Sequence, residues 1–254
     1  MVKPKKHLGQ HFLRSEEIAA RIAAALPVEG CASALEIGPG TGILTRALLA
    51  RKDMPPFYAA EIDAESVRYL AAHIPELQGH LLPGDFLQLR LEEHLPLPLA
   101  LVGNYPYNIS SQIVFKMLEQ RAHIPVMAGM FQREVARRLT APPGSRTYGI
   151  LSVLCDAYYE RDYLFEVPPE AFRPPPQVHS AVICMRRKPE PQLPCTEAQL
   201  RRVVKAGFNQ RRKTLRNALK SLQLPFESRH EPLLQKRAEQ LHFSEFADIA
   251  SLLP

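Results

Sequence analysis

The sequence is short of cysteine and has no long hydrophobic run, and each shortage excludes a class of protein. The four cysteines among 254 residues are scattered and form no CxxC pair. A disulfide framework or a zinc site is therefore not expected, and reduced thiols in the cytoplasm fit this pattern. No stretch approaches the roughly 18 apolar residues that a membrane span needs, and the basic N-terminus has no hydrophobic segment behind it. We expect a cytoplasmic protein without a membrane or metal partner.

Acidic residues are also absent from one long segment, and this absence is more specific than the net charge. The chain carries a formal charge of +6, which alone does not decide whether the partner is anionic. Between positions 201 and 220, however, no carboxylate accompanies eight basic residues: Arg201, Arg202, Lys205, Arg211, Arg212, Lys213, Arg216 and Lys220. A solvated face seldom needs such an excess, so this segment is a candidate for contacting nucleic-acid phosphates.

The hydrophobic pattern predicts an α/β domain followed by a small helical one. Apolar strand-like runs at 34–37, 57–62, 81–82, 99–102 and 125–131 alternate with helical segments such as 15–26 and 44–50. Such alternation indicates right-handed βαβ units around a parallel sheet, and runs at 158–167 and 178–185 are close enough to pair as an antiparallel hairpin at its edge. Residues 188–194 contain three prolines and read as a linker. The expected domains are therefore residues 1–188 and 189–254.

A glycine-rich turn joins the first strand to its helix and predicts a cofactor site. Residues 36–42 read Glu-Ile-Gly-Pro-Gly-Thr-Gly, in which Gly38 and Gly40 let the backbone approach a ligand closely. The dinucleotide fingerprint would need a further glycine at position 43, which is isoleucine. The ExGxGxG pattern is typical instead of class I methyltransferases, which use S-adenosylmethionine, although a nicotinamide enzyme or an ordinary tight turn remains an alternative.

Two carboxylates follow later strands and complete the expected cofactor site. Glu61, at the end of the second strand, can accept the two ribose hydroxyls of an adenosine, and Asp63 is the alternative for that role. Asp85, after the third strand, is placed to accept from the adenine amine of the cofactor. Its alternative role is to cap the following segment.

Residues 104–107, Asn-Tyr-Pro-Tyr, follow the fourth strand directly and predict the chemistry. The amine of adenine is a poor nucleophile because its lone pair is delocalised into the ring. The side-chain oxygen of Asn104 and a backbone carbonyl near Tyr105 can accept its two hydrogens and stabilise the charge that develops on nitrogen. Pro106 belongs to the same turn, and Tyr107 offers a flat face for the extruded base. An ordinary Asn-Pro turn is the alternative.

These motifs and others make the chain similar to the bacterial small-subunit ribosomal RNA adenine N6,N6-dimethyltransferases (the KsgA type). The resemblance runs over nearly the whole length and includes segments 8–13, 36–42, 60–63, 84–86, 104–111, 131–136, 172–174, 178–182 and 208–213. It implies a Rossmann-like methyltransferase sheet with a small C-terminal all-helical domain. It also implies cofactor contacts at His11, Leu13, Gly38, Glu61, Asp85 and Asn104. Tyr105 departs from the family, whose bacterial members usually carry an aliphatic residue there.

The resemblance further implies a substrate and a partner. It predicts dimethylation of two adjacent adenines in the 3′-terminal hairpin of small-subunit ribosomal RNA, in the RNA or in a precursor of the small subunit, by a monomeric enzyme. Arg211, Arg212, Lys213 and Arg216 are the candidate RNA contacts, and Phe172 is a candidate for stacking on the base, with core packing as its equal alternative. The competing functions are a large-subunit enzyme of the antibiotic-resistance type and a non-catalytic assembly or transcription factor on the same fold.

Overall fold

A computed structural model describes residues 2–189 and 193–254. The chain divides into two compact units, the first formed by Met1–Ala136 with Arg161–Arg187 and the second by Arg137–Glu160 with Lys188–Pro254. The boundary expected at residue 188 lies at the start of the last segment of the second unit. This unit also includes the earlier residues 137–160. Part of the expected linker, residues 190–192, lies outside the described residues.

The first unit is built on a seven-stranded sheet with the order β4-β3-β2-β5-β6-β9-β7. The strands comprise β2 (Ser33–Ile37), β3 (Phe57–Glu61), β4 (Leu81–Pro83), β5 (Leu99–Asn104), β6 (Val126–Gln132), β7 (Tyr159–Val167) and β9 (Ser180–Arg187). Strands β4, β3, β2, β5 and β6 are parallel, and β9 pairs antiparallel with β6. The expected α/β sheet is therefore confirmed, with the two expected late strands as neighbours at its edge.

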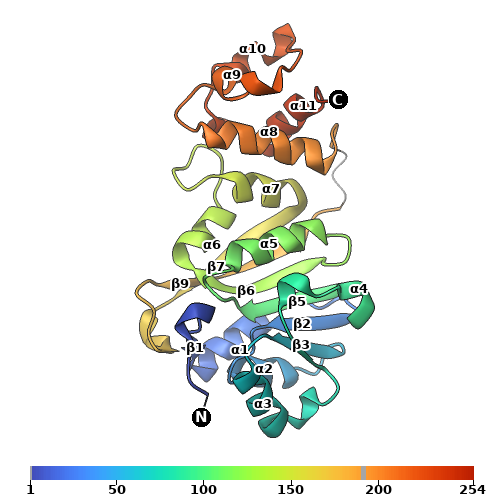
Figure 1. Cartoon of the computed structure of the whole chain (residues 1–254), viewed down its shortest axis with the longest axis vertical. Helices are drawn as coiled ribbons and strands as arrows, with labels where there is room; N and C mark the ends of the chain where they lie inside the picture. Colours follow the sequence, from blue (N-terminus) through green and yellow to red (C-terminus); the bar gives the residue numbers. More distant parts are fainter. Residues whose placement is uncertain (1, 190–192) are drawn as a thin grey trace. The chain divides into compact units, whose positions relative to one another are not determined.

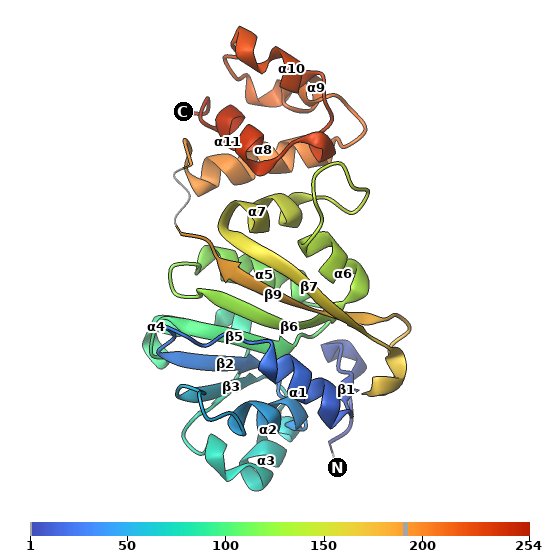
Figure 2. The same cartoon turned by 180° about the vertical axis from the view of Figure 1, so that it is seen from behind.

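Helices cover both faces of this sheet, so its central strands are apolar on both sides. All five residues of β2 are buried, as are the first five of β5. Helix α5 (Ser110–Glu119) lies in front of the sheet in Figure 1, and α1 (Glu16–Ala24) lies in front of it in Figure 2, the view from behind. The α1 face has one continuous core, to which α2 (Ile43–Leu49) and α3 (Ala64–His73) also contribute.

Local signals in the sequence explain where these helices begin. The Ser15 hydroxyl accepts a hydrogen bond from the Ile18 amide and caps α1, as its position before the helical pattern predicts. Asp63 caps α3 in the same way, accepting from the Glu65 amide. The remaining first-unit helices are α4 (Leu91–His94) and α6 (Arg133–Leu139), of which α6 runs across the boundary between the units.

The order of the strands determines where a ligand can bind. The chain runs outward from β2 through β3 to β4, then returns to lay β5 on the other side of β2. This reversal leaves a crevice outside the carboxyl ends of β2 and β5, the usual ligand site of open α/β sheets. The glycine loop follows β2, and Asn104 is the last residue of β5.

The second unit is helical in its described residues. It contains α7 (Ile150–Tyr158), α8 (Glu197–Asn209), α9 (Leu215–Ala218), α10 (Glu231–Leu234) and α11 (Phe243–Ala250). The apolar side of α8, including Val203 and Val204, is fully buried, and a Cβ added at Gly207 would lie 3.3 Å from Leu215 Cδ1 of α9. Nowhere in the described parts of either unit is there a helix long and apolar enough to cross a membrane.

One carboxyl group is buried in the core at the end of β2. Glu36 is 1% exposed, and its Oε2 accepts a 2.6 Å hydrogen bond from the Thr45 hydroxyl of α2. Burial raises the pKa of Glu36 to about 8, which outweighs the opposite effect of the Thr45 hydrogen bond. The group is therefore mainly protonated at neutral pH in the folded protein.

This raised pKa predicts a pH-dependent loss of stability. The unfolded chain releases the Glu36 proton near pH 4.5 and the folded chain near pH 8. The contribution of Glu36 to the free energy of unfolding is therefore complete below pH 4.5 and is lost as the pH rises to about 8. Over that window the free energy of unfolding should fall by up to about 1.4 kcal/mol per pH unit relative to Glu36→Gln, which cannot ionise. Denaturant melts of both proteins from pH 5 to pH 8 measure the difference. Parallel pH profiles would show that Glu36 is ionised in the fold.

Candidate active site

A cavity of about 670 Å³ opens at the carboxyl ends of four strands. Each strand provides part of its wall: Gly38 and Gly40 after β2, Glu61 at the end of β3, Gly84 and Asp85 after β4, and Asn104 to Tyr107 at the end of β5. The cavity is thus at the crevice that the strand order predicts. No group of three His, Cys, Asp or Glu side chains in the described chain is placed to hold a metal ion.

The glycine loop folds tightly because its glycines have no side chain at points where neighbouring residues approach closely. Gly40 has a φ of +58°, and a Cβ atom added there would lie 2.8 Å from the ring of Phe12. Only glycine adopts this conformation without strain. The loop backbone can therefore form one wall of the cavity.

Glu61 joins the loop to the end of β3. Its Oε2 accepts from the Gly40 amide at 3.0 Å, and its Oε1 accepts from the Asp63 amide at 2.9 Å. The residue is 3% exposed, and burial raises the pKa of its carboxyl group, an effect that the two amide hydrogen bonds oppose. Each oxygen retains a lone pair, so the carboxyl group can still accept from hydroxyls of a ligand in the cavity.

The two nearby aspartates differ in their relation to the cavity. Asp63 does not line it, because its carboxylate is used by Ser66 Oγ, the Glu65 amide and the Lys5 ammonium. Asp85 does line it and also caps the following turn through a 2.9 Å bond from the Leu87 amide. The capping and ligand-binding interpretations of Asp85 are therefore compatible, since the bond found for its second oxygen in the described chain is a long one, from Gln88 at 3.4 Å.

Asn104 is oriented by the N-terminal segment. Its Nδ2 donates to the backbone carbonyl of His11 at 2.9 Å. That bond uses one of the donor hydrogens and leaves Oδ1 available as an acceptor. Asn104 itself lines the cavity.

Tyr105 lines the cavity, yet its side chain is in the core. The ring is 0% exposed and lies 4.6 Å from the Phe131 ring, and its hydroxyl donates to the Ala128 carbonyl at 2.9 Å. Space for the ring comes from Gly103 and Gly129 on neighbouring strands, where an added Cβ would lie 3.2 and 2.7 Å from it. The tyrosine ring, at a position where the family usually has an aliphatic side chain, therefore changes the packing of the core below the site.

Tyr107 and His11 form a second wall of the cavity. Their rings are stacked with centroids 5.2 Å apart, and the Tyr107 hydroxyl is hydrogen-bonded to Ser180 on β9. His11 is held by a 2.8 Å contact between Nδ1 and the Pro174 carbonyl. The adjacent strand β1 (Phe12–Leu13) pairs with β8 (Phe172–Arg173), which fixes this part of the N-terminal segment.

The structure brings most of the predicted site residues together, but not all. Leu13 is not part of this cavity and lines two other depressions beside the glycine loop, one of which also includes Gly38 and Asn104. Phe172 is 2% exposed and belongs to the hydrophobic core, so core packing, the equal alternative to base stacking, accounts for its position. Arg211, Arg212, Lys213 and Arg216 lie in the second unit.

Sequence reasoning missed several residues that line the cavity. Ile62 is 55% exposed, although it is apolar and follows Glu61 directly. A large apolar side chain directly after a strand-end carboxylate could have indicated it as a surface for a flat ligand. Others come from the N-terminal segment or the turn after β4: Leu8, Gly9, Gln10, Phe12 and Phe86.

The sequence matches the family described as ribosomal RNA adenine dimethylase over residues 1–252. The chain belongs to this family. It is accordingly an S-adenosylmethionine-dependent methyltransferase, as the glycine loop predicts.

Curated relatives in this family are similar over almost the whole chain. Proteins named ribosomal RNA small subunit methyltransferase A from Cytophaga hutchinsonii and Flavobacterium johnsoniae are 49% and 50% identical over 99% and 96% of this chain, covering 98% and 94% of their own lengths. A solved dimethyladenosine transferase from Plasmodium falciparum has a TM-score of 0.79 at 23% identity, covering 94% of this chain and 96% of its own, and shows the same fold. The solved 23S rRNA methyltransferase ErmE has a TM-score of 0.71 at 28% identity, covering 94% of this chain and 98% of its own.

The cavity fits the cofactor of this family. It combines a buried carboxyl group with spare acceptor positions, a glycine loop that exposes backbone, and the exposed apolar side chain of Ile62. These are the contacts that ribose hydroxyls, a flexible amino-acid chain and an adenine ring require.

The first binding prediction concerns Glu61. If its carboxyl group accepts the ribose hydroxyls, Glu61→Ala should weaken S-adenosylmethionine binding by about 2 kcal/mol, or roughly 30-fold, because buried hydroxyls lose their partner. Isothermal titration calorimetry measures the affinity, and Glu76→Ala, an exposed carboxylate on the same unit, is the control. An unchanged affinity would remove the ribose role from Glu61, and tight binding of a nicotinamide dinucleotide would contradict the cofactor assignment.

Proposed function

We propose that this enzyme dimethylates the N6 amines of two adjacent adenines in the 3′-terminal hairpin of small-subunit ribosomal RNA. The observation that carries the proposal is Asn104, whose Nδ2 is held by the His11 carbonyl so that Oδ1 is the acceptor left for the substrate. Relatives named for the small subunit are about 50% identical to the chain, against 28% for the large-subunit enzyme ErmE, which favours the small-subunit substrate. The enzyme would act as a cytoplasmic monomer on the RNA or a subunit precursor.

The residues after β5 can activate an adenine amine without a general base. Asn104 Oδ1 and the Tyr105 carbonyl would accept the two amine hydrogens, which favours a pyramidal nitrogen with a localised lone pair. The cofactor supplies a methyl group on an electrophilic sulfonium. As positive charge develops on the nitrogen, the same two acceptors stabilise it, and the methylated ammonium then loses its proton readily to solvent.

Tyr107 would hold the base in line for the reaction. An adenine must leave its stack to reach the cavity, and stacking on an aromatic ring offsets part of that cost. His11 covers one face of Tyr107, so the base would use the opposite face. The Tyr107–Ser180 hydrogen bond fixes the ring, which restricts the orientation of the amine toward Asn104.

Mapping the methyl groups separates the candidate functions. Transfer of tritiated methyl groups from labelled cofactor is measured on small-subunit and on large-subunit RNA. We expect label in two adjacent adenines near the 3′ end of the small-subunit RNA. Label in large-subunit RNA would favour the resistance-type enzyme, and absence of transfer to either RNA would favour a non-catalytic assembly factor.

The catalytic role of Asn104 can be tested by substitution. Asn104→Ala should lower turnover by about 10²–10³-fold, the usual cost of losing one acceptor directed at developing charge. Asn108→Ala is a matched control, because Asn108 Nδ2 also holds the N-terminal segment, through the His7 carbonyl at 3.3 Å, but does not line the cavity. Single-turnover methylation at saturating cofactor measures both variants. Equal losses would place the effect of Asn104 in the N-terminal segment instead of the reaction.

The second unit offers an RNA surface, although its basic residues are not equivalent. Arg211 donates to the Arg146 carbonyl at 2.9 Å and lies near Glu239, and Arg216 is paired with Glu231. Arg212 and Lys213 are exposed, and no ion pair is found for them among the described residues. Among the four candidate RNA contacts, these two side chains are therefore the better placed for phosphate contacts.

This difference between paired and exposed basic residues can be tested by measuring the salt dependence of RNA binding. Replacing Arg212 and Lys213 together by Ala should lower the slope of log affinity against log salt by about 0.7–0.9 per lost contact, or about 1.4–1.8 in total. The pair Arg211→Ala and Arg216→Ala removes the same charge from side chains that are already paired, and should change the slope less. RNA affinity over a range of salt concentrations gives both slopes, with cofactor affinity as the check on folding. Unchanged slopes would mean that RNA docks elsewhere.

A further inference from the structure

The N-terminal segment lies along the cavity and contacts its wall at the glycine loop and at Asn104. Phe12 packs on Gly40, the His11 carbonyl holds Asn104, and Gly9 lies against Asn108. Residues 8–12 all line the cavity. We call residues 5–12 the cover, because residues 8–12 form part of the cavity wall and Lys5 precedes them.

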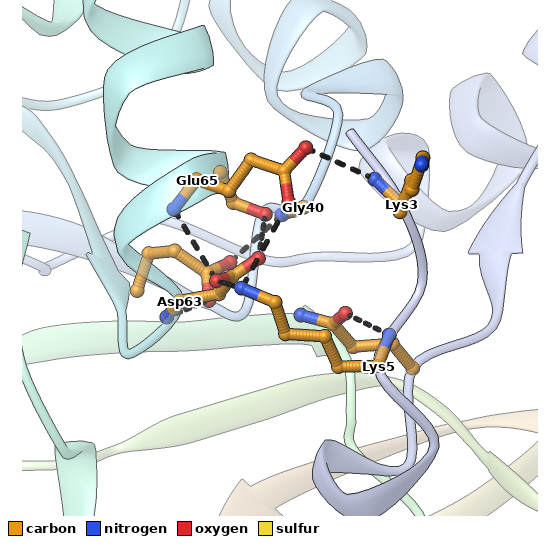
Figure 3. Close-up of polar contacts among 8 residues, drawn as sticks. Lys3, Lys5, Gly40, Asp63 and Glu65 are labelled. Atoms are coloured by element: carbon orange, nitrogen blue, oxygen red, sulfur yellow. Dashed lines mark hydrogen bonds and ion pairs between the residues drawn. The ribbon is translucent and has the colours of Figure 1, made fainter. Parts of the chain in front are cut away.

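One ion pair joins Lys5, at the start of the cover, to Asp63, which follows β3 and caps α3. The Lys5 ammonium contacts Asp63 Oδ1, and Figure 3 shows the Lys5 side chain reaching from the N-terminal segment to Asp63. The Asp63 side chain is 1% exposed and that of Lys5 is 34% exposed, so the pair is partly buried. Glu65 also faces Lys5, at 3.9 Å, and its Oε1 accepts from the Lys3 amide at 3.3 Å.

Asp63 is held in its ionised form in this pair. Burial alone would raise the pKa of Asp63, but hydrogen bonds from Lys5, the Glu65 amide and Ser66 outweigh it, and the pKa is lowered. Asp63 is therefore charged at neutral pH, and removing the Lys5 ammonium would leave a buried carboxylate without its cation.

The same aspartate touches the expected cofactor contact. The Asp63 amide donates to Glu61 Oε1, while Glu61 Oε2 accepts from the Gly40 amide. A continuous path of contacts therefore leads from Lys5 through Asp63 and Glu61 to the glycine loop. Within the cover, the Gln10 side chain accepts from the Lys5 amide at 2.8 Å, so Lys5 is also tied to residues that line the cavity.

We propose that Lys5 is a positioning residue that latches the cover over the cofactor cavity through its ion pair with Asp63. The inference rests on the cofactor site proposed above. With the latch formed, the cover and the Glu61 carboxyl group are held in the arrangement that encloses S-adenosylmethionine. For the product cofactor to leave, the Lys5–Asp63 pair must separate. The rate of cofactor dissociation is thus the property that Lys5 controls.

The test compares three lysines of the same segment. Lys5→Met keeps the aliphatic stem and removes the charge, while Lys3→Met and Lys6→Met make the same change at exposed positions for which no ion pair is found in the described chain. Dissociation of S-adenosylmethionine from the full-length protein is followed by displacement with excess unlabelled cofactor. We expect Lys5→Met to dissociate at least about tenfold faster, since loss of one partner of a buried charge pair acts mainly on dissociation. Lys5→Arg should restore most of the slow rate.

Further measurements distinguish a latch from a general loss of stability. RNA affinity should be unchanged in Lys5→Met, and its kcat at saturating cofactor should fall less than kcat/KM for the cofactor. Asp63→Asn, which can still cap α3, should accelerate dissociation similarly, and the double variant should add little to either single change. Fully additive effects would mean that the two residues act separately.

The outcomes separate this proposal from the one on which it rests. A wild-type dissociation rate in Lys5→Met, together with weakened binding in Glu61→Ala, would overturn the latch and keep the cofactor site. Unchanged binding in Glu61→Ala would overturn the site itself. Equal acceleration in all three lysine variants would also overturn the latch, because the effect would then belong to the net charge of the segment.

Discussion

The Glu61 carboxyl group is the contact on which the geometry of the site depends. It is nearly inaccessible to solvent, and each of its oxygens accepts an amide from a different part of the chain. One amide belongs to the glycine loop after β2 and the other to Asp63, the N-cap of α3 just after β3, so two neighbouring strand ends share one acceptor. Burying such a group is costly unless it is hydrogen-bonded, and these two amides offset much of that cost. The remaining acceptor positions face the cavity, which lets one side chain shape the loop and bind a ligand.

Most of the fold could be predicted because its signals are local. Alternating apolar runs and helical segments indicated the parallel sheet, Ser15 indicated the start of α1, and the glycine loop indicated the crevice. The convergence of Gly38, Glu61, Asp85 and Asn104 followed from a rule of topology, since the carboxyl ends of parallel strands meet at one edge. No contact between distant residues had to be known.

What the sequence could not provide depends on such contacts. Nothing near Tyr105 indicates that its ring turns into the core, because the space for it is made by Gly103 and by Gly129, 24 positions further along the chain. Asp63 resembled Glu61 as a ribose acceptor until its carboxylate was seen to hold Lys5 and cap α3. The basic run likewise reads as uniform, whereas carboxylates outside it, Glu231 and Glu239, pair with some of its members and leave others exposed.

The packing around Tyr105 limits how this active site can change during evolution. A side chain at Gly129 would collide with the Gly103 carbonyl at 2.2 Å, and the φ of +147° there also disfavours any other residue. The two glycines therefore leave a space that residue 105 alone fills, and a hydroxyl bonded to Ala128 secures the ring in it. A smaller residue at 105 would have to be accompanied by a larger one nearby, such as at Phe131, to avoid a void beneath the catalytic turn. Substitutions at these positions should accordingly be inherited as sets, so that lineages with different residues at 105 carry different cores under the same surface chemistry.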